Sequence, residues 1–82
     1  MSENKELINQ ICSVLAEALH IDGSEVTAEA AFGDVPQWDS MGHMEVMMLL
    51  EEKFGVEINA DTISNLLNVQ LIFEHIEGMK NE

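Results

Sequence analysis

The sequence predicts an all-α fold: a small four-helix bundle with a long loop between helices one and two and a short third helix. Three observations support this prediction. Apolar residues recur at helical spacing in separate segments of the chain. Hydrophobic residues make up 46% of the sequence and are mainly aliphatic, with three Phe, one Trp and no Tyr. A single proline leaves few places where a helix must break.

The first helix is expected from about Asn4 to His20, where aliphatic residues form one stripe. Residues 21–39 lack this periodicity, and Asp22-Gly23-Ser24 is typical of a turn. A connection of this length within a compact domain indicates either a function or an unrecognised element. Four apolar residues are expected to fix the loop to the core: Ile21, Val26, Phe32 and Val35.

The second helix is expected to begin at Asp39 or Ser40, since either side chain makes a good N-cap, and to end near Phe54, before Gly55. A third, short helix is expected over about residues 60–67. A fourth is expected over about residues 69–77, capped by Asn68 and stopped by Gly78.

The 82 residues allow one domain, 1–82, whose stability must come from apolar packing. Cys12 is the only cysteine, so no disulfide can form within the chain. It lies at the edge of the first apolar stripe, where a small hydrophobic residue is a better interpretation than a nucleophile. One Cys and three scattered His do not make a zinc pattern, and no metal site is expected.

Charge is the strongest compositional feature, because 16 acidic residues against three basic ones give a formal net charge of −13. Such a surface repels nucleic acids and anionic membranes and favours basic protein partners. The simpler interpretation is that the acids only maintain solubility. The polar N-terminus and the absence of a long apolar run lead us to expect a cytoplasmic protein. A monomer is the default expectation.

The second helix carries two apolar faces. One contains Val46, Met47, Leu50 and Phe54 and is expected to face the core. The other contains three methionines among two glutamates: Met41, Met44, Glu45, Met48 and Glu52. Either this helix is buried all round, or the second stripe is exposed and meets partners. We favour exposure, because burying unpaired carboxylates is costly and methionine suits a surface that accepts several partners.

Asp39-Ser40-Met41 opens this helix, and by itself an Asp-Ser pair is best explained as a helix cap. In its context the chain resembles the acyl carrier protein family, whose signature is Asp-Ser-Leu at the start of the second helix. The likeness extends over nearly the whole chain, through Ser24-Glu25-Val26-Thr27, Ala31-Phe32, residues 50–58 and residues 69–76.

The resemblance implies a carrier that is not an enzyme. Ser40 would receive a phosphopantetheine arm from coenzyme A through a phosphopantetheinyl transferase with Mg²⁺, and Asp39 would help that enzyme to engage. The arm would hold an acyl or aminoacyl group as a thioester. The second face of this helix, which we call the Met/Glu stripe (Met41, Met44, Glu45, Met48 and Glu52), would bind partner enzymes. These are the transferase and the enzymes that load and transfer the cargo. We interpret His43 as a surface or helix-flank residue without a catalytic role.

Three residues depart from the fatty-acid-synthesis members of the family, namely Trp38, Gly42 and His43. These departures favour a stand-alone carrier of a specialised pathway. The alternative is an acidic helical adaptor that docks on basic partners without a prosthetic group and does not need Ser40. The sequence shows no paired acid–base groups and no phosphate loop that would indicate an enzyme. It also shows no Ca²⁺ loop that would indicate an EF-hand.

Overall fold

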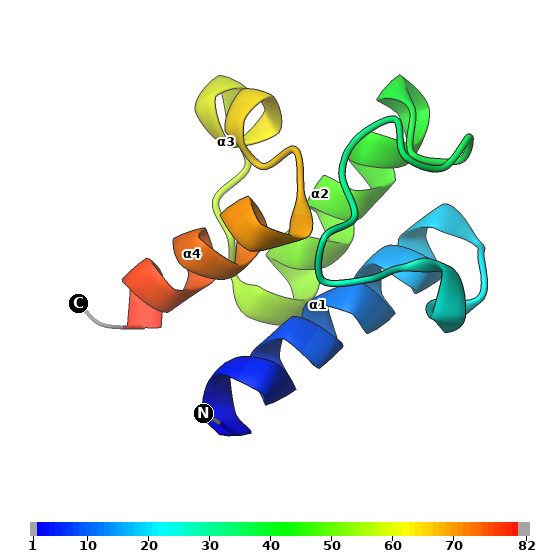
Figure 1. Cartoon of the computed structure of the whole chain (residues 1–82). Helices are drawn as coiled ribbons and strands as arrows, with labels where there is room; N and C mark the ends of the chain where they lie inside the picture. The colour runs from blue at the N-terminus through cyan, green and yellow to red at the C-terminus, as the bar shows by residue number, and fades with distance from the viewer. Residues whose placement is uncertain (1, 81–82) are drawn as a thin grey trace.

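The structure is a computed structural model that describes residues 2–80, and over this range it is all-helical. The predicted four-helix bundle, with its long first loop and short third helix, is confirmed (Figure 1). None of the described helices is both long and apolar enough to cross a bilayer. In chain order the elements are α1 (Ser2–Leu19), the 3-10 turn η1 (Gly23–Glu25), α2 (Ser40–Phe54), α3 (Ala60–Asn65) and α4 (Val69–Lys80).

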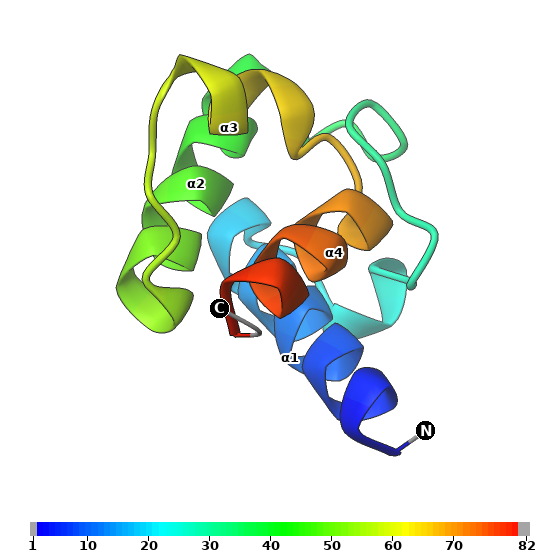
Figure 2. The same cartoon turned by 90° about the vertical axis from the view of Figure 1, so that its left-hand side faces the viewer.

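Helix α1 organises the bundle, because it packs against α2, α4 and η1. Figures 1 and 2 show the short α3 at the end of the molecule away from the start of α1, where it contacts α2. The apolar stripes of the long helices meet in one aliphatic core, as their periodicity predicts. The side chains at its centre are completely buried: Ile11, Leu15, Val46, Leu50 and Ile72.

Both ends of α2 are fixed by the residues that the sequence predicts. At the start, the carboxylate of Asp39 accepts a hydrogen bond of 2.9 Å from the backbone N–H of Gly42. At the end, Gly55 adopts a left-handed conformation with φ of 77°, and its N–H donates back to the carbonyl groups of the last turn. The Asp39 cap defines where α2 begins after the long loop, and Gly55 defines where it ends.

Helices α3 and α4 differ from their predicted bounds. A reciprocal pair of hydrogen bonds between Asn59 and Thr62 caps α3, which ends at Asn65, two residues earlier than predicted. Asn68 caps α4 by accepting from the N–H of Leu71 at 2.7 Å. The predicted stop at Gly78 is wrong, since α4 continues to Lys80. A glycine weakens a helix without ending it, and Met79 beyond it packs on the core.

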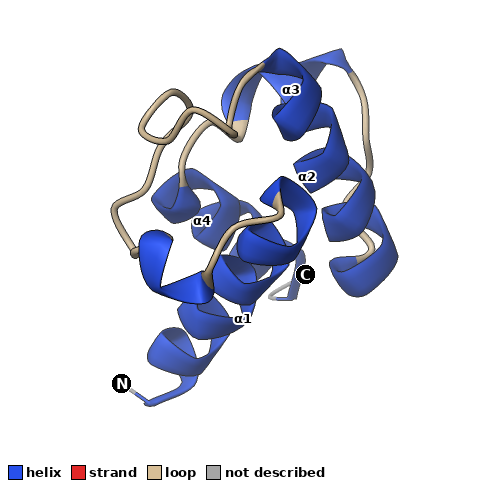
Figure 3. Ribbon diagram, turned by 90° about the vertical axis from the view of Figure 1, so that its right-hand side faces the viewer, coloured by secondary structure: helices blue, strands red, loops and turns tan. Residues whose placement is uncertain are grey.

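The long loop is held by backbone pairing with the link between α3 and α4. The N–H of Phe32 donates to the carbonyl of Leu67 at 2.7 Å, and the N–H of Val69 donates to the carbonyl of Ala30 at 3.0 Å. Figure 3 shows this loop covering one side of the bundle. Of the expected anchors, Val26 is buried, and Ile21 and Val35 pack partly on the core.

Phe32 is the exception, because 40% of it is exposed and its expected role as a core anchor is wrong. Its backbone is fixed to Leu67, which removes the need for its ring to hold the loop. The ring instead lies edge-on to His43, at a centroid separation of 5.6 Å. Loop attachment therefore depends on backbone hydrogen bonds at this point and leaves an aromatic ring near the surface.

Cys12 is half-buried against the core, as a small hydrophobic residue would be. Burial raises the pKa of its thiol above the ordinary value. Less of the thiol is therefore ionised at neutral pH, which agrees with its interpretation as a packing residue and not as a nucleophile.

We predict that Leu50→Ala lowers the free energy of unfolding by about 2–5 kcal/mol, because it leaves a cavity in the aliphatic core. Leu71→Ala is the matched control, since Leu71 is 40% exposed on α4 and should change the free energy by less than about 1 kcal/mol. Urea unfolding followed by circular dichroism measures both. Equal effects of the two substitutions would contradict the assigned core.

Candidate functional site

Ser40 is the first residue of α2 and its side chain is exposed to solvent. The long loop leads directly into it, and the Asp39 cap fixes the backbone at this point. The first N–H groups of a helix have no partners within the helix and carry a partial positive charge, which suits a nearby phosphate. The hydroxyl of Ser40 is thus presented on the surface at a helix N-terminus.

A half-open groove lies beside Ser40. Its volume is about 540 Å³, and it is formed by the loop, the head of α2, α3 and the link after α3. The lining is mainly apolar, and the polar atoms come from two serines and a histidine. The residues that line it are Phe32, Ser40, His43, Met44, Ile63, Ser64 and Leu67.

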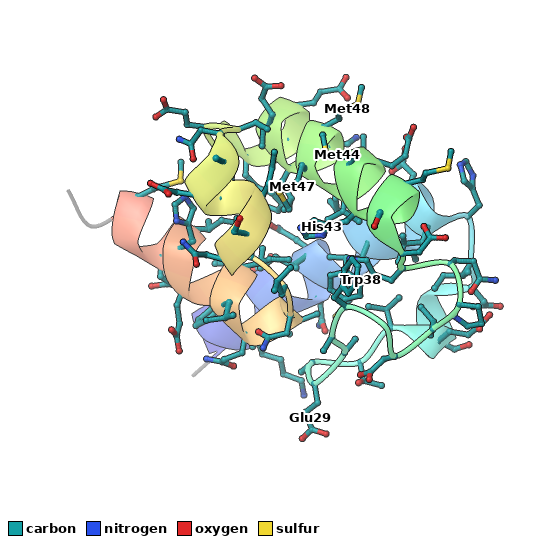
Figure 4. The ribbon with its side chains drawn as sticks, turned by 90° about the horizontal axis from the view of Figure 1, so that it is seen from above. Glu29, Trp38, His43, Met44, Met47 and Met48 are labelled. Atoms are coloured by element: carbon teal, nitrogen blue, oxygen red, sulfur yellow. The ribbon has the colours of Figure 1, made fainter. Side chains whose placement is uncertain are left out.

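His43 is buried on the inner side of this groove, with 4% exposure, so its predicted place on the surface or helix flank is wrong. Its Nδ1 accepts a hydrogen bond of 3.0 Å from the indole N–H of Trp38. Its Nε2 lies 2.8 Å from the backbone carbonyl oxygen of Ile63. One side chain thereby connects the end of the loop, α2 and α3, as Figure 4 shows for Trp38 and His43.

These two hydrogen bonds fix the tautomer of the imidazole. A carbonyl oxygen can only accept, so Nε2 carries the ring proton and donates to Ile63. Nδ1 is then the acceptor for the Trp38 N–H, and both buried polar groups are satisfied. Because neither ring nitrogen is free, His43 has no base to offer to Ser40, which agrees with the non-catalytic role predicted for it.

Gly42 allows the head of α2 to approach its neighbours closely. A Cβ atom at this position would overlap the carbonyl oxygen of Gln37 and lie 2.8 Å from Cδ2 of Leu19. Any larger residue must therefore push α2 away from the loop and from α1. Gly42, which departs from the fatty-acid-synthesis pattern, is explained by this packing.

The Met/Glu stripe of α2 is exposed, so the interpretation in which this helix is buried all round is wrong. Met41, Met44 and Met48 are 81%, 43% and 58% exposed, respectively. Glu45 and Glu52 are also exposed. On the opposite face Val46, Met47 and Leu50 are completely buried and Phe54 is partly buried, as predicted. Figure 4 shows Met44 and Met48 on the outside of α2, away from Trp38.

The groove was not predicted from the sequence, although one signal for it was present. His43 precedes Val46, Met47 and Leu50 by three, four and seven residues, which places it on their inward face. Because histidine is polar, His43 was wrongly predicted to lie on the surface or helix flank. The other walls, Phe32, Ile63 and Leu67, come from distant segments and meet only through the fold.

An exposed serine at the head of a helix, in a small helical bundle, is the arrangement that the carrier-protein class requires. Comparison with known proteins agrees with this class. The family profile described as phosphopantetheine attachment site matches residues 9–76. The acyl carrier protein of Helicobacter pylori (strain G27) is 40% identical over 74 residues, which cover 90% of this chain and 95% of that protein. The acyl carrier protein of Helicobacter acinonychis (strain Sheeba) is 38% identical with the same coverage.

The chain belongs to the acyl carrier protein family. It is a carrier, not an enzyme, and it bears thioesters on a covalently attached phosphopantetheine group. Its partners include a phosphopantetheinyl transferase and enzymes that handle acyl groups. The alternative of an adaptor without a prosthetic group is not favoured.

The residues at the head of α2 fit this prosthetic group. Ser40 offers an exposed hydroxyl for a phosphodiester, and the groove beside it has room for an apolar or uncharged ligand. The group supplies a terminal thiol that forms the thioester. At the head of α2 the chain would supply the attachment hydroxyl and the partial charge of the helix N-terminus.

We predict that Gly42→Ala destabilises the fold by about 1–3 kcal/mol, because the added methyl group overlaps Gln37 and Leu19. Gly78→Ala is the matched control, since a Cβ there meets nothing within 4 Å. It lies within α4 and should stabilise the protein by up to about 1 kcal/mol. Thermal unfolding of both variants checks the prediction, and a neutral Gly42→Ala would refute the close approach.

Proposed function

We propose that Ser40 is the attachment site of the phosphopantetheine arm and that the carrier presents the cargo from the head of α2. The observation that carries this proposal is the exposure of the Ser40 side chain at the first position of α2, on the rim of the apolar groove. An arm joined here can extend to a visiting enzyme or fold back toward the groove.

The attachment step is a phosphoryl transfer catalysed by the transferase. The Oγ atom of Ser40 attacks the β-phosphorus of coenzyme A, and the bond from that phosphorus to the bridging oxygen breaks. Adenosine 3′,5′-bisphosphate leaves with the bond electrons, and the serine proton passes to a base of the transferase. Mg²⁺ in the transferase neutralises charge on the phosphates. The carrier therefore needs only an accessible hydroxyl.

Asp39 has two compatible roles in this proposal. Its carboxylate accepts the N–H of Gly42 and so fixes the backbone that carries Ser40. It is also exposed, so its remaining lone pairs are available to the transferase or its metal ion. Loss of the carboxylate would disturb the cap and the engagement of the transferase together.

The Met/Glu stripe is proposed as the surface that partner enzymes recognise. It begins beside the attachment serine, and its side chains are already in solvent, so docking there requires no rearrangement of the core. The chain has three basic residues in all, and Lys53 is the one within α2. Glutamates at 45 and 52 therefore favour partners with Arg or Lys around an apolar centre.

The finer description of the carrier follows from the same features. We propose a stand-alone carrier of acyl or aminoacyl groups in a specialised pathway, acting as a monomer in the cytoplasm. Trp38, Gly42 and His43 support the specialised role, because they depart from the pattern of the fatty-acid-synthesis carriers and also pack together next to Ser40. The subtype therefore rests on residues next to the attachment site.

The assignment of Ser40 is tested by loading the protein with coenzyme A and a broad-specificity phosphopantetheinyl transferase. Intact-mass spectrometry should show one added phosphopantetheine on the wild type and none on Ser40→Ala. Ser64→Ala is the control, since Ser64 lines the same groove and is also exposed. An unmodified wild type, under conditions that load a known carrier, would overturn the assignment.

The recognition surface is tested by reversing Glu45 and Glu52 to Lys. We expect kcat/KM of the transferase for this carrier to fall by about tenfold or more, because electrostatic steering is reversed. Reversal of Glu6 and Glu17 on α1 changes the net charge equally and should have a smaller effect. If the two double variants lose equal activity, net charge and not the stripe governs recognition.

A further inference from the structure

A buried polar side chain from α2 lines the groove beside Ser40. His43 lines the groove and is 4% exposed, while its partner Trp38 is 1% exposed and lies in the core. The two rings are hydrogen-bonded, and their planes differ by 27°. The second bond of His43, to the carbonyl of Ile63, joins this pair to α3. We call the hydrogen-bonded His43 and Trp38 side chains the floor of the groove.

The outer walls of the groove are apolar and mutually fixed. Phe32 and Leu67 are joined by a backbone hydrogen bond of 2.7 Å. Met44 and Ile63 face them from α2 and α3. Phe32 contacts the floor through its edge-on packing with His43. The groove is therefore an apolar recess that the fold holds open to solvent on its outer side.

We propose that the floor limits the length of the cargo. The acyl group on the arm of Ser40 lies in the outer groove, and the His43–Trp38 pair keeps it out of the bundle interior. The carrier thus shelters short or compact acyl groups and leaves the distal part of a long chain in solvent. This inference rests on the proposed attachment at Ser40 and adds the class of cargo and the residues that select it.

Two physical arguments support the barrier. A chain that passes the floor must displace the imidazole, which leaves the buried indole N–H of Trp38 without its partner and breaks the part-buried bond to the carbonyl of Ile63. Met47 and Leu50 follow His43 on the same face of α2 and are completely buried in the core, where packing leaves little free volume. The outer groove, in contrast, accepts apolar atoms without breaking a hydrogen bond.

The proposal is tested with the full chain loaded with acetyl-, butyryl-, octanoyl- or dodecanoyl-phosphopantetheine from the matching acyl-coenzyme A. For the wild type, we expect Tm to rise from the acetyl form through the butyryl form and to show no further rise between the octanoyl and dodecanoyl forms. Trp38 is the only tryptophan, so its emission reports directly on the floor. Its emission should be the same for the octanoyl and dodecanoyl forms.

Removing the floor should remove the limit. In His43→Ala, Tm should continue to rise through dodecanoyl, and the emission of Trp38 should shift with chain length. Phe32→Ala changes a wall and leaves the floor intact, so it should reduce the rise in Tm for short chains without altering the limit. If His43→Ala does not fold, the wild-type series and Phe32→Ala decide the question.

The experiment distinguishes a failure of the length limit from a failure of the proposed attachment at Ser40. Intact-mass spectrometry of every sample shows first whether the acyl arm is present. Failure of the wild type to load contradicts attachment at Ser40. A loaded wild type whose Tm and emission keep changing through dodecanoyl, as in the variant, shows that long chains pass the floor and overturns this inference.

Discussion

The two hydrogen bonds of His43 are the constraint on which the geometry around Ser40 depends. They join the loop through Trp38 and α3 through Ile63 to the first turns of α2. Each contributes only about 1 kcal/mol in net terms, but losing the imidazole leaves the buried indole N–H of Trp38 without a partner at a cost of about 1–3 kcal/mol. One buried ring therefore helps to fix the segments around Ser40, together with the Asp39 cap and the backbone bonds of the loop.

The two bonds of His43 agree with the orientation that burial of the apolar face gives α2. Turning His43 inward places Val46, Met47 and Leu50 in the core, and it leaves the methionines and glutamates of the other face in solvent. Gly42 permits the close contact with the loop that this orientation requires. A single rotation of one helix thus produces the core, the exposed stripe and the exposed hydroxyl at its head.

Much of the fold was predictable, because amphipathic periodicity and caps are local signals. Asp39 and Gly55 marked the ends of α2 correctly, whereas Gly78 did not mark the end of α4, since packing of Met79 supports another turn. The position of the candidate serine was predicted from the Asp-Ser pair and from the resemblance of the chain to the acyl carrier protein family. The exposed stripe followed from the cost of burying glutamates.

The groove was not predictable in the same way. Its walls come from four segments, and their approach depends on backbone bonds between the loop and the α3–α4 link. His43 was misplaced because its polarity was given more weight than its position on the helical wheel. A buried histidine is acceptable only when partners satisfy both nitrogens, and these partners are brought together by tertiary structure.

The central claim is that a buried His43 holds α2 so that Ser40 alone presents the arm. A crystal structure of the phosphopantetheinylated protein tests it most directly. We expect electron density to continue from Oγ of Ser40, with His43 still bonded to Trp38 and to the carbonyl of Ile63. An arm on another residue, or an imidazole turned out to solvent in the loaded protein, would contradict the account.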